Sequence, residues 1–250
     1  MPGTLRGVRR GTVLITGVLA LVVVATAAAA WGGKDPARNF RIGRLPSACN
    51  SAPARVRCIN AGVYYLDRAR AKVGLPAYKL LAKFPRLTAA QQIFVLTNLD
   101  RVQYGLPPIT GLAGQLNRDA LVNGVKAAGD PSPSSSAFLT TWNANWAGGF
   151  FNAPMAYEAW MWDDGVGSGN ADCTAANHAG CWGHRHNILW KFPGSAVLAM
   201  GAAEGNGPTG RAYATLIVGG LPAYAPRYTY TWAKAVAAGA GSNTYNPGRP

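Results

Sequence analysis

Apolar residues recur at helical spacing in two segments of the N-terminal half of the chain. Residues 59–73 place apolar side chains three and four positions apart, which predicts a helix. Thr88 followed by Gln91 is a capping-box start for a second helix that runs to about Tyr104. Gly105 and the prolines after it end this helix, because proline cannot continue a helical hydrogen-bond pattern.

The pattern changes from helical to strand-like towards the C-terminus. A third helix is predicted over residues 112–128, and Asn152 can cap a fourth that has Pro154 in its first turn. Short apolar runs at residues 195–200 and 211–218 are typical of strands, and the glycine-rich stretch between them predicts a hairpin. Helices followed by an antiparallel pair indicate the α+β class.

The first 31 residues have the character of an export sequence. Arg6, Arg9 and Arg10 precede a nearly uncharged stretch over residues 11–31. That stretch fits a cleaved signal peptide, and it is also long enough to contact the membrane as an uncleaved anchor. Because the arginines favour the cytoplasmic side, we expect the rest of the chain to be secreted or held on the outer face of the cytoplasmic membrane.

The chain is strongly basic even without this leader. The 250 residues carry a formal charge of +14, and residues 32–250 hold 21 basic and 10 acidic side chains, a charge of +11. An exported cationic protein is expected to associate with anionic lipid or glycan of the cell envelope, or with a protein partner. Nucleic acid is the disfavoured partner, because the Lys and Arg residues are scattered and no nucleic-acid motif is present.

The four cysteines lie in two local pairs, Cys49 with Cys58 and Cys173 with Cys181. Two local disulfides are the favoured connectivity, since thiols of an exported protein usually oxidise. The alternative for the second pair is a zinc site that adds His178 and His184, whose residue types suit Zn²⁺ but whose spacing matches no familiar zinc motif.

Two of the three histidines lie in the run from Cys181 to Leu189. His184 and His186 would share one face of a strand, whereas a helix would point them apart. A cleft histidine titrates near neutral pH and can act as a base or a metal ligand. The alternative is that His184 only holds the loop through a hydrogen bond. Both interpretations stay open for His184, and the structural one is favoured for His186.

Four segments, taken together, resemble the bacterial CAP domains of the SCP/PR-1-like, cysteine-rich secretory superfamily. The most specific is Gly183-His-Arg-His-Asn-Ile-Leu189, which resembles the family's GHR-x-N-I-L motif. Asn98 to Arg101, Gly105 to Ile109 and Asn145 to Gly148 resemble the N-x-x-R, G-L-x-P and E-N-I-A-x-G stretches. The resemblance implies a CAP-like α-β-α sandwich with a small, mostly antiparallel sheet and a central cleft.

The resemblance also divides the chain. The expected parts are a signal peptide or anchor over residues 1–31, a basic linker over 32–48, a helical N-terminal extension over 49–87, the CAP/SCP-like domain over 88–220 and a C-terminal tail over 221–250.

In that family the cleft is typically lined by two histidines and two glutamates, and some members bind a divalent cation there. The implied alignment places His184 at the second histidine and Asp163 at one glutamate. It places Asn123 and Ala144 at the other two positions, where neither side chain is a usual zinc ligand. The implied cleft residues are therefore Asn123, Ala144, Asp163, His184 and the neighbouring His186.

Only His184 and Asp163 remain as candidates for catalysis. They are incomplete as a metal site, because zinc sites generally use three or four protein ligands, so the expectation is no cofactor. A divalent cation such as zinc would require the loop over residues 165–182 to fold back and add a ligand. The side chains that could complete such a site are His178, Glu158, Asp164 and His186.

These observations favour an exported, non-enzymatic or catalytically degenerate CAP-like module that binds lipid, glycan or protein at the cell envelope or outside the cell. The alternatives are a metal-assisted or His-dependent hydrolase, a triad of a serine with His184 and Asp163, and a purely structural interaction domain. Aromatic residues around the expected cleft are usually core, but in a groove they could hold acyl chains or sugar rings. They are Trp142, Trp146, Phe150, Phe151, Tyr157, Trp160 and Trp162.

Overall fold

The computed structural model describes residues 34–43, 45–134, 141–176, 179–192, 195, 197–220, 226–243, 245 and 247. The predicted leader over residues 1–31 and the candidate ligand His178 lie outside these residues. Within the described part of the chain, no helix is both long and apolar enough to cross a membrane.

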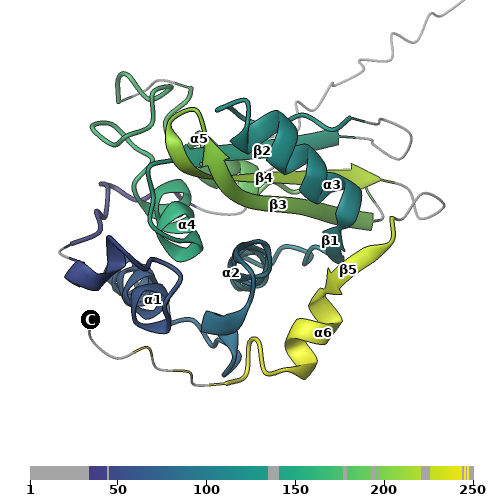
Figure 1. Ribbon diagram of the computed structural model, residues 1–250, viewed down its shortest axis with the longest axis horizontal. Helices are drawn as coiled ribbons and strands as arrows, with labels where there is room; N and C mark the ends of the chain where they lie inside the picture. The colour runs from purple at the N-terminus through teal and green to yellow at the C-terminus, as the bar shows by residue number, and fades with distance from the viewer. Residues whose placement is uncertain are drawn as a thin grey trace, which may run out of the picture.

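Five strands form one sheet with the order β2-β4-β3-β1-β5 (Figure 1). Neighbouring strands are antiparallel except β1 and β3, which are parallel. The expected α+β class with a mostly antiparallel sheet is therefore confirmed. The strands are β1 Gly111–Ala113, β2 Thr141–Gly148, β3 Val197–Gly207, β4 Gly210–Gly220 and β5 Tyr228–Thr231.

Helices cover both faces of the sheet (Figure 1). On one face α3 and its π-helical continuation pack on β3, and on the other α2 and α4 lie against the sheet, with α1 outside α4. This gives three layers, helix, sheet and helix. The α-helices are α1 Val56–Lys72, α2 Ala89–Gln103, α3 Gly114–Asp119, α4 Ala153–Trp162, α5 Gly183–Ile188 and α6 Trp232–Ala237. Shorter helical turns are Ser47–Cys49, Phe84–Arg86 and the π-helix Ala120–Val125.

The predicted helix starts are observed where side-chain caps satisfy free backbone amides. The Thr88 hydroxyl accepts a hydrogen bond from the Gln91 amide at 3.3 Å, and the Gln91 side chain accepts one from the Thr88 amide at 3.1 Å. The Asn152 side chain accepts from the Met155 amide at 3.3 Å, at the start of α4. Each cap is worth about 1 kcal/mol, so these starts are encoded locally.

The predicted helix over residues 112–128 begins later than expected. Its first residues form β1, where Gly111 pairs with Ala199 of β3 and with Thr231 of β5. A side chain at Gly111 would collide with Tyr228 and the Tyr230 carbonyl, so glycine permits the close approach of β5. The segment expected to be a C-terminal tail over residues 221–250 thus contains a strand of the sheet and the helix α6.

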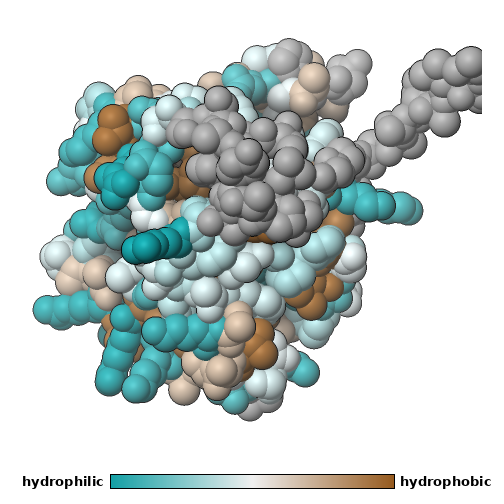
Figure 2. Space-filling view, turned by 90° about the vertical axis from the view of Figure 1, so that its right-hand side faces the viewer, coloured by the Kyte–Doolittle hydropathy of each residue, from teal (hydrophilic) through white to brown (hydrophobic). Residues whose placement is uncertain are grey.

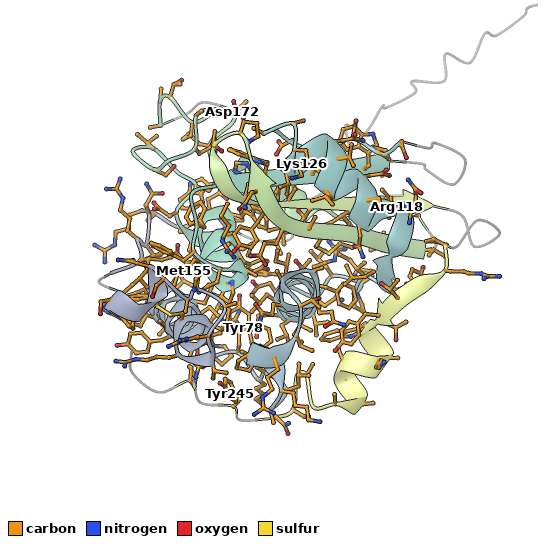
Figure 3. The ribbon with its side chains drawn as sticks, in the orientation of Figure 1. Tyr78, Arg118, Lys126, Met155, Asp172 and Tyr245 are labelled. Carbon is orange, nitrogen blue, oxygen red and sulfur yellow. A yellow bond between two sulfur atoms is a disulfide. The ribbon has the colours of Figure 1, made fainter. Side chains whose placement is uncertain are left out.

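A buried polar network joins α1, α2 and α4 through one carboxylate. Asp100 accepts hydrogen bonds from Arg70, from the Tyr78 hydroxyl at 2.5 Å and from the Tyr157 hydroxyl at 2.8 Å. Arg70 also donates to the Pro76 carbonyl and stacks over the Tyr78 ring at 4.1 Å. All four side chains are buried, and Tyr78 is marked in Figure 3. This network fixes the position of α1 against the two central helices.

Both predicted disulfides are present, Cys49 with Cys58 and Cys173 with Cys181. Among the described residues no cysteine is free. Two local disulfides of this kind are typical of proteins that fold in an oxidising compartment. The sulfurs of Cys173 and Cys181 are bonded to each other, so they are not thiolate ligands for the zinc site considered as an alternative.

The outer surface on the side of α6 is mixed in character. Figure 2 shows apolar residues as small separate patches among hydrophilic ones on the part of this face that is drawn in colour. Scattered apolar residues of this kind are common on protein surfaces.

Candidate functional site

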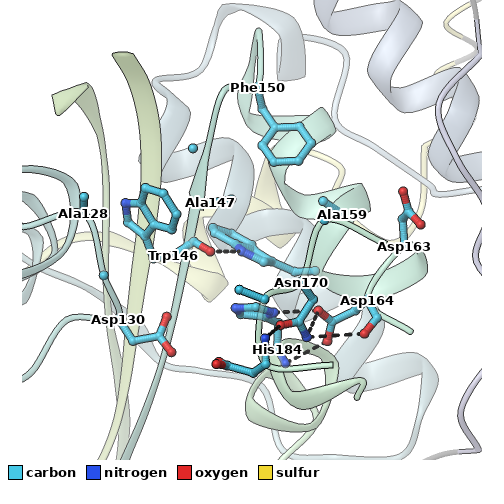
Figure 4. A pocket seen from close by; sticks show the side chains of 16 residues that line it. Ala128, Asp130, Trp146, Ala147, Phe150, Ala159, Asp163, Asp164, Asn170 and His184 are labelled. Carbon is cyan, nitrogen blue, oxygen red and sulfur yellow. Dashed lines mark hydrogen bonds and ion pairs between the residues drawn. The ribbon is translucent and has the colours of Figure 1, made fainter. Parts of the chain in front are cut away.

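A cavity of about 400 Å³ opens between the end of β2, the end of α4 and the loop that follows α4 (Figure 4). It has a size typical of small-molecule sites. Its walls combine aromatic rings, carboxylates and one histidine. The residues that line it are Ala128, Gly129, Asp130, Trp146, Ala147, Gly148, Phe150, Ala159, Trp160, Asp163, Asp164, Gly169, Asn170, Ala171, Asp172 and His184.

His184 and Asp164 form a close pair on one wall of the cavity (Figure 4). His184 Nδ1 lies 2.6 Å from Asp164 Oδ1, and the His184 backbone amide donates to Asp164 Oδ2 at 3.0 Å. Asn170 fixes the same carboxylate by donating to Oδ1 at 2.8 Å. The carboxylate is buried and held from three directions, so it orients the imidazole ring.

The surrounding carboxylates set the charge of this histidine. Burial alone would lower the pKa of His184, because it disfavours the charged imidazolium. The hydrogen bond to Asp164 and the charges of Asp164, Asp130 and Asp172 act in the opposite direction, and the net result is a raised pKa. The pocket therefore stabilises a positive charge on its own histidine.

Replacing Asp164 with Asn is expected to lower the pKa of His184, because the hydrogen-bonded negative charge is lost. A histidine with a raised folded-state pKa stabilises the fold below its unfolded pKa of about 6.5, and this stability is lost as pH rises through the folded value. The variant should lose that pH-dependent stability. NMR titration of the imidazole protons and unfolding at several pH values measure both effects.

Asp35→Asn provides the control for this titration. Asp35 Oδ1 lies 2.9 Å from His186 Nε2 and Asp35 is not among the residues that line the cavity, so this variant should leave the pKa of His184 unchanged. An unchanged His184 pKa in the Asp164→Asn variant would contradict the assigned pairing.

Asp163 also lines the cavity, but its carboxylate lies near Arg41 and not near the His184 ring. Its Oδ1 lies 3.8 Å from Arg41 Nε, and this oxygen accepts no hydrogen bond among the described residues. Burial raises its pKa, the charge of Arg41 lowers it and the charge of Asp164 raises it. The net effect is a raised pKa of Asp163. For Asp130, burial likewise raises the pKa more than His184 and the Trp146 amide lower it.

The implied cleft set does not come together as expected. Asn123 lies outside the cavity lining and donates to the Ser132 carbonyl at 2.7 Å. Ala144 is buried and also lies outside the lining, where its carbonyl accepts from Asn187. His186 points away from His184, because both belong to the helix α5 and residues two apart on a helix face different directions. Of the five expected residues, only Asp163 and His184 line the cavity.

The residues that sequence reasoning missed are Asp164 as the partner of His184, and Asn170, Asp130 and Asp172 around it. The alignment through Trp160-Met-Trp-Asp163 selected the neighbouring carboxylate. The feature that distinguishes Asp164 from Asp163 is the end of α4 at Trp162. After this residue the chain turns and directs the Asp164 side chain towards α5.

The run around α5 serves mainly to hold this helix in place. Buried Arg185 donates to the Met161 carbonyl and to the Tyr104 hydroxyl, and stacks over the Trp162 ring at 4.8 Å. Asn187 donates to the Ala144 carbonyl at 2.7 Å. These contacts attach α5 to α4, α2 and β2, so the motif positions His184 rather than adding further reactive groups.

The segment expected to be a basic linker, residues 32–48, is packed against the cavity loop where it is described. Asn39 accepts from the Gly165 amide and donates to the Val166 carbonyl, both at 2.8 Å. The Phe40 amide donates to the Trp162 carbonyl. Residues 34–43 of the expected linker are therefore held against the loop that follows α4. Such a segment lacks periodicity because it is held by individual backbone contacts rather than by one apolar face.

The residues present do not fit the metal site that the resemblance implies. In the described ranges, no group of three or more His, Cys, Asp and Glu side chains is placed to hold a metal ion. Two of the four family positions are Asn123 and Ala144, and neither lies in the cavity lining. We derive no chemical step through a metal.

Comparison with known proteins gives a structural similarity at low sequence identity. No protein-family model matches the sequence, and no curated protein matches it. Among solved structures, the chain is similar to an extracellular protein containing an SCP domain from Bacillus anthracis str. Ames, at 17% sequence identity and a TM-score of 0.34. The match covers 52% of this chain and 40% of that chain, so this chain spans less than half the length of that protein.

Proposed function

We propose that this protein is an exported CAP-like binding domain that docks on an anionic surface of the cell envelope through its N-terminal segment. The observation that carries the proposal is a separation of charge along the chain. Residues 34–87 contain 12 basic and 2 acidic side chains, whereas residues 88–250 contain 9 basic and 8 acidic ones. The positive charge is thus concentrated in the part of the chain that directly follows the predicted leader.

The helix α1 presents this charge on its outer face. Its inner face carries Ile59, Val63 and Leu66, which are buried on the α4 side. Arg57 and Lys72 are exposed and lie about half a turn away from those residues, with Arg68 between them on the same face. Arg68 also stacks over Tyr64 at 5.8 Å. We call Arg57, Arg68 and Lys72 the α1 basic face.

The chemistry that fits this face is a dense array of phosphate or carboxylate groups. Each Lys or Arg near an anionic membrane contributes about 1 kcal/mol of binding, and this contribution is screened by salt. Anionic lipid headgroups and anionic cell-wall glycan share this chemistry. The CAP-like part of the proposal is supported by the motif residues, since Arg101 donates to the Ile188 and Trp190 carbonyls and so joins the N-x-x-R motif to the end of α5.

Protein that begins at residue 32 is expected to sediment with vesicles containing phosphatidylglycerol and not with vesicles of phosphatidylcholine alone. The reason is that only the former carry the negative charge that the N-terminal segment requires. The same binding assay is repeated with isolated cell wall and with duplex DNA in place of the vesicles. Retention on none of the anionic surfaces at low salt would defeat the proposal, and retention on DNA alone would assign a different polyanion.

A second candidate is a His-dependent hydrolase, and the close Asp164–His184 pair is the observation that favours it. A carboxylate that orients a histidine is the arrangement a general base uses. No Ser, Thr or Cys is among the residues that line the cavity, so His184 would have to activate water. Hydrolysis of a panel of chromogenic esters that disappears in His184→Ala, together with elemental analysis for a bound metal, would favour this candidate. Equal rates in the variant would exclude it.

A further inference from the structure

The cavity is lined by acidic side chains, although the protein as a whole is basic. Four of the ten acidic residues of the chain line it, and no Lys or Arg is among its lining residues. They are Asp130, Asp163, Asp164 and Asp172. Asp164 is paired with His184 and Asn170, Asp163 lies 3.8 Å from Arg41 Nε, and Asp130 accepts a hydrogen bond from the Trp146 amide. The lining therefore presents an excess of negative charge to anything that enters it.

These carboxylates surround the cavity instead of converging on one point. Figure 4 shows Asp130 on one side and Asp163 and Asp164 on the opposite side. In the part of the chain that is described, no three potential ligands are close enough to hold a metal ion. An organic cation whose body fills the space between the walls fits such spacing better than a metal ion, which needs several converging oxygen ligands.

Aromatic rings form the remaining walls. Trp146, Phe150 and Trp160 line the cavity, and the Trp160 indole is fixed by donating to the Trp146 carbonyl at 3.0 Å (Figure 4). Aromatic faces attract organic cations through their quadrupole, most strongly where water is partly excluded. Carboxylates and aromatic rings in one cavity thus favour the same class of ligand.

We propose that this cavity binds an organic ammonium ion attached to an apolar or ring-shaped body. The ammonium group pairs with Asp130, and the body packs against Trp146 and Trp160. The site is separate from the α1 basic face, so it goes beyond docking on an anionic surface and can be tested apart from it.

The test uses benzylamine as the cationic probe and benzyl alcohol as its neutral counterpart, with tryptophan fluorescence as the readout near neutral pH. Benzylamine is expected to give a saturable change and to bind about tenfold more tightly than benzyl alcohol, as a charge-dependent contact over aromatic rings requires. Asp130→Asn should weaken benzylamine binding about fivefold or more, because it removes an accessible lining charge.

Glu204→Gln is the matched control, since it removes one carboxylate on β3 outside the cavity lining and should leave binding unchanged. Equal binding of both probes would overturn the proposal in favour of an uncharged apolar site. Displacement of benzylamine by millimolar Ca²⁺ at constant ionic strength would overturn it in favour of a metal site, and no saturable binding would overturn it outright. Vesicle sedimentation of Asp130→Asn should match the wild type, which separates failure here from failure of the proposed function.

Discussion

Replacing Asp100 with alanine is expected to lower the free energy of unfolding by about 3–5 kcal/mol, the range found when one partner of a buried ion pair is removed. The variant would leave the Arg70 guanidinium buried without its counter-charge, and the Tyr78 and Tyr157 hydroxyls without their acceptor. Arg70 and Asp100 are almost fully inaccessible to water, so solvent cannot replace the lost contacts. Urea unfolding followed by circular dichroism measures the loss.

The exposed Arg211–Glu204 pair supplies the control for this prediction. Its side chains are about one third exposed, and such pairs contribute about 0–1 kcal/mol. Glu204→Ala should therefore change the unfolding free energy by no more than that. If Asp100→Ala and Glu204→Ala cost the same, the buried network does not hold α1, α2 and α4 together as described.

Gly201→Ala is expected to have the second large effect. A Cβ atom at this position of β3 would lie 2.0 Å from the backbone carbonyl oxygen of Leu116 in α3. Backbone cannot move aside as a flexible side chain can, so α3 would have to separate from the sheet. We expect a loss of about 3 kcal/mol or more in unfolding free energy, at the upper end for an overpacked core.

Gly205→Ala tests the same strand with a softer contact. Its Cβ would meet only the side chains of Val125 and Leu121, at 3.2 and 3.3 Å. Those side chains can shift by a few tenths of an ångström, so the expected cost is within about 1 kcal/mol. A Gly201→Ala variant as stable as Gly205→Ala would show that α3 does not pack on β3 in this way.

Features encoded within a few residues could be read from the sequence. The capping box at Thr88 and the Asn152 cap each place a side-chain acceptor opposite a nearby amide, and both are observed. The two disulfides join cysteines eight and nine positions apart, and both form as expected. These features depend on local geometry, which the order of residues determines directly.

Features that depend on distant partners could not be read in this way. β1 has only three residues, and it is a strand because β3 and β5 pair with it from about 90 and 120 positions away. The choice between Asp163 and Asp164 depends on where α4 ends and how the chain turns towards α5. Neither the strand β1 nor the choice of Asp164 over Asp163 can be predicted from the residue types alone.

The distribution of charge shows a similar limit. Along the sequence the Lys and Arg residues look scattered and form no Lys- or Arg-rich stripe. Helix formation over α1 brings Arg57, Arg68 and Lys72 to one face, because residues four, eleven and fifteen positions apart on a helix project in similar directions. The basic surface is therefore a product of folding.

The most direct test of the central claim is a charge reversal on two different faces. One variant changes Arg57, Arg68 and Lys72 to Glu on α1. The other changes Arg118, Lys126 and Lys191 to Glu, three exposed residues of the 88–220 region. Figure 3 shows Arg118 and Lys126 on the opposite side of the molecule from Tyr78, which neighbours α1. The two variants have the same net charge.

Binding of both variants to vesicles containing phosphatidylglycerol is compared with the wild type by sedimentation, after circular dichroism has verified their fold. The α1 variant should lose about 100-fold or more in affinity, since three basic residues at about 1 kcal/mol each are removed and reversed. The Arg118, Lys126 and Lys191 variant should stay within a few-fold of the wild type. Equal losses in the two variants, or no loss in the α1 variant, would contradict docking through the N-terminal segment.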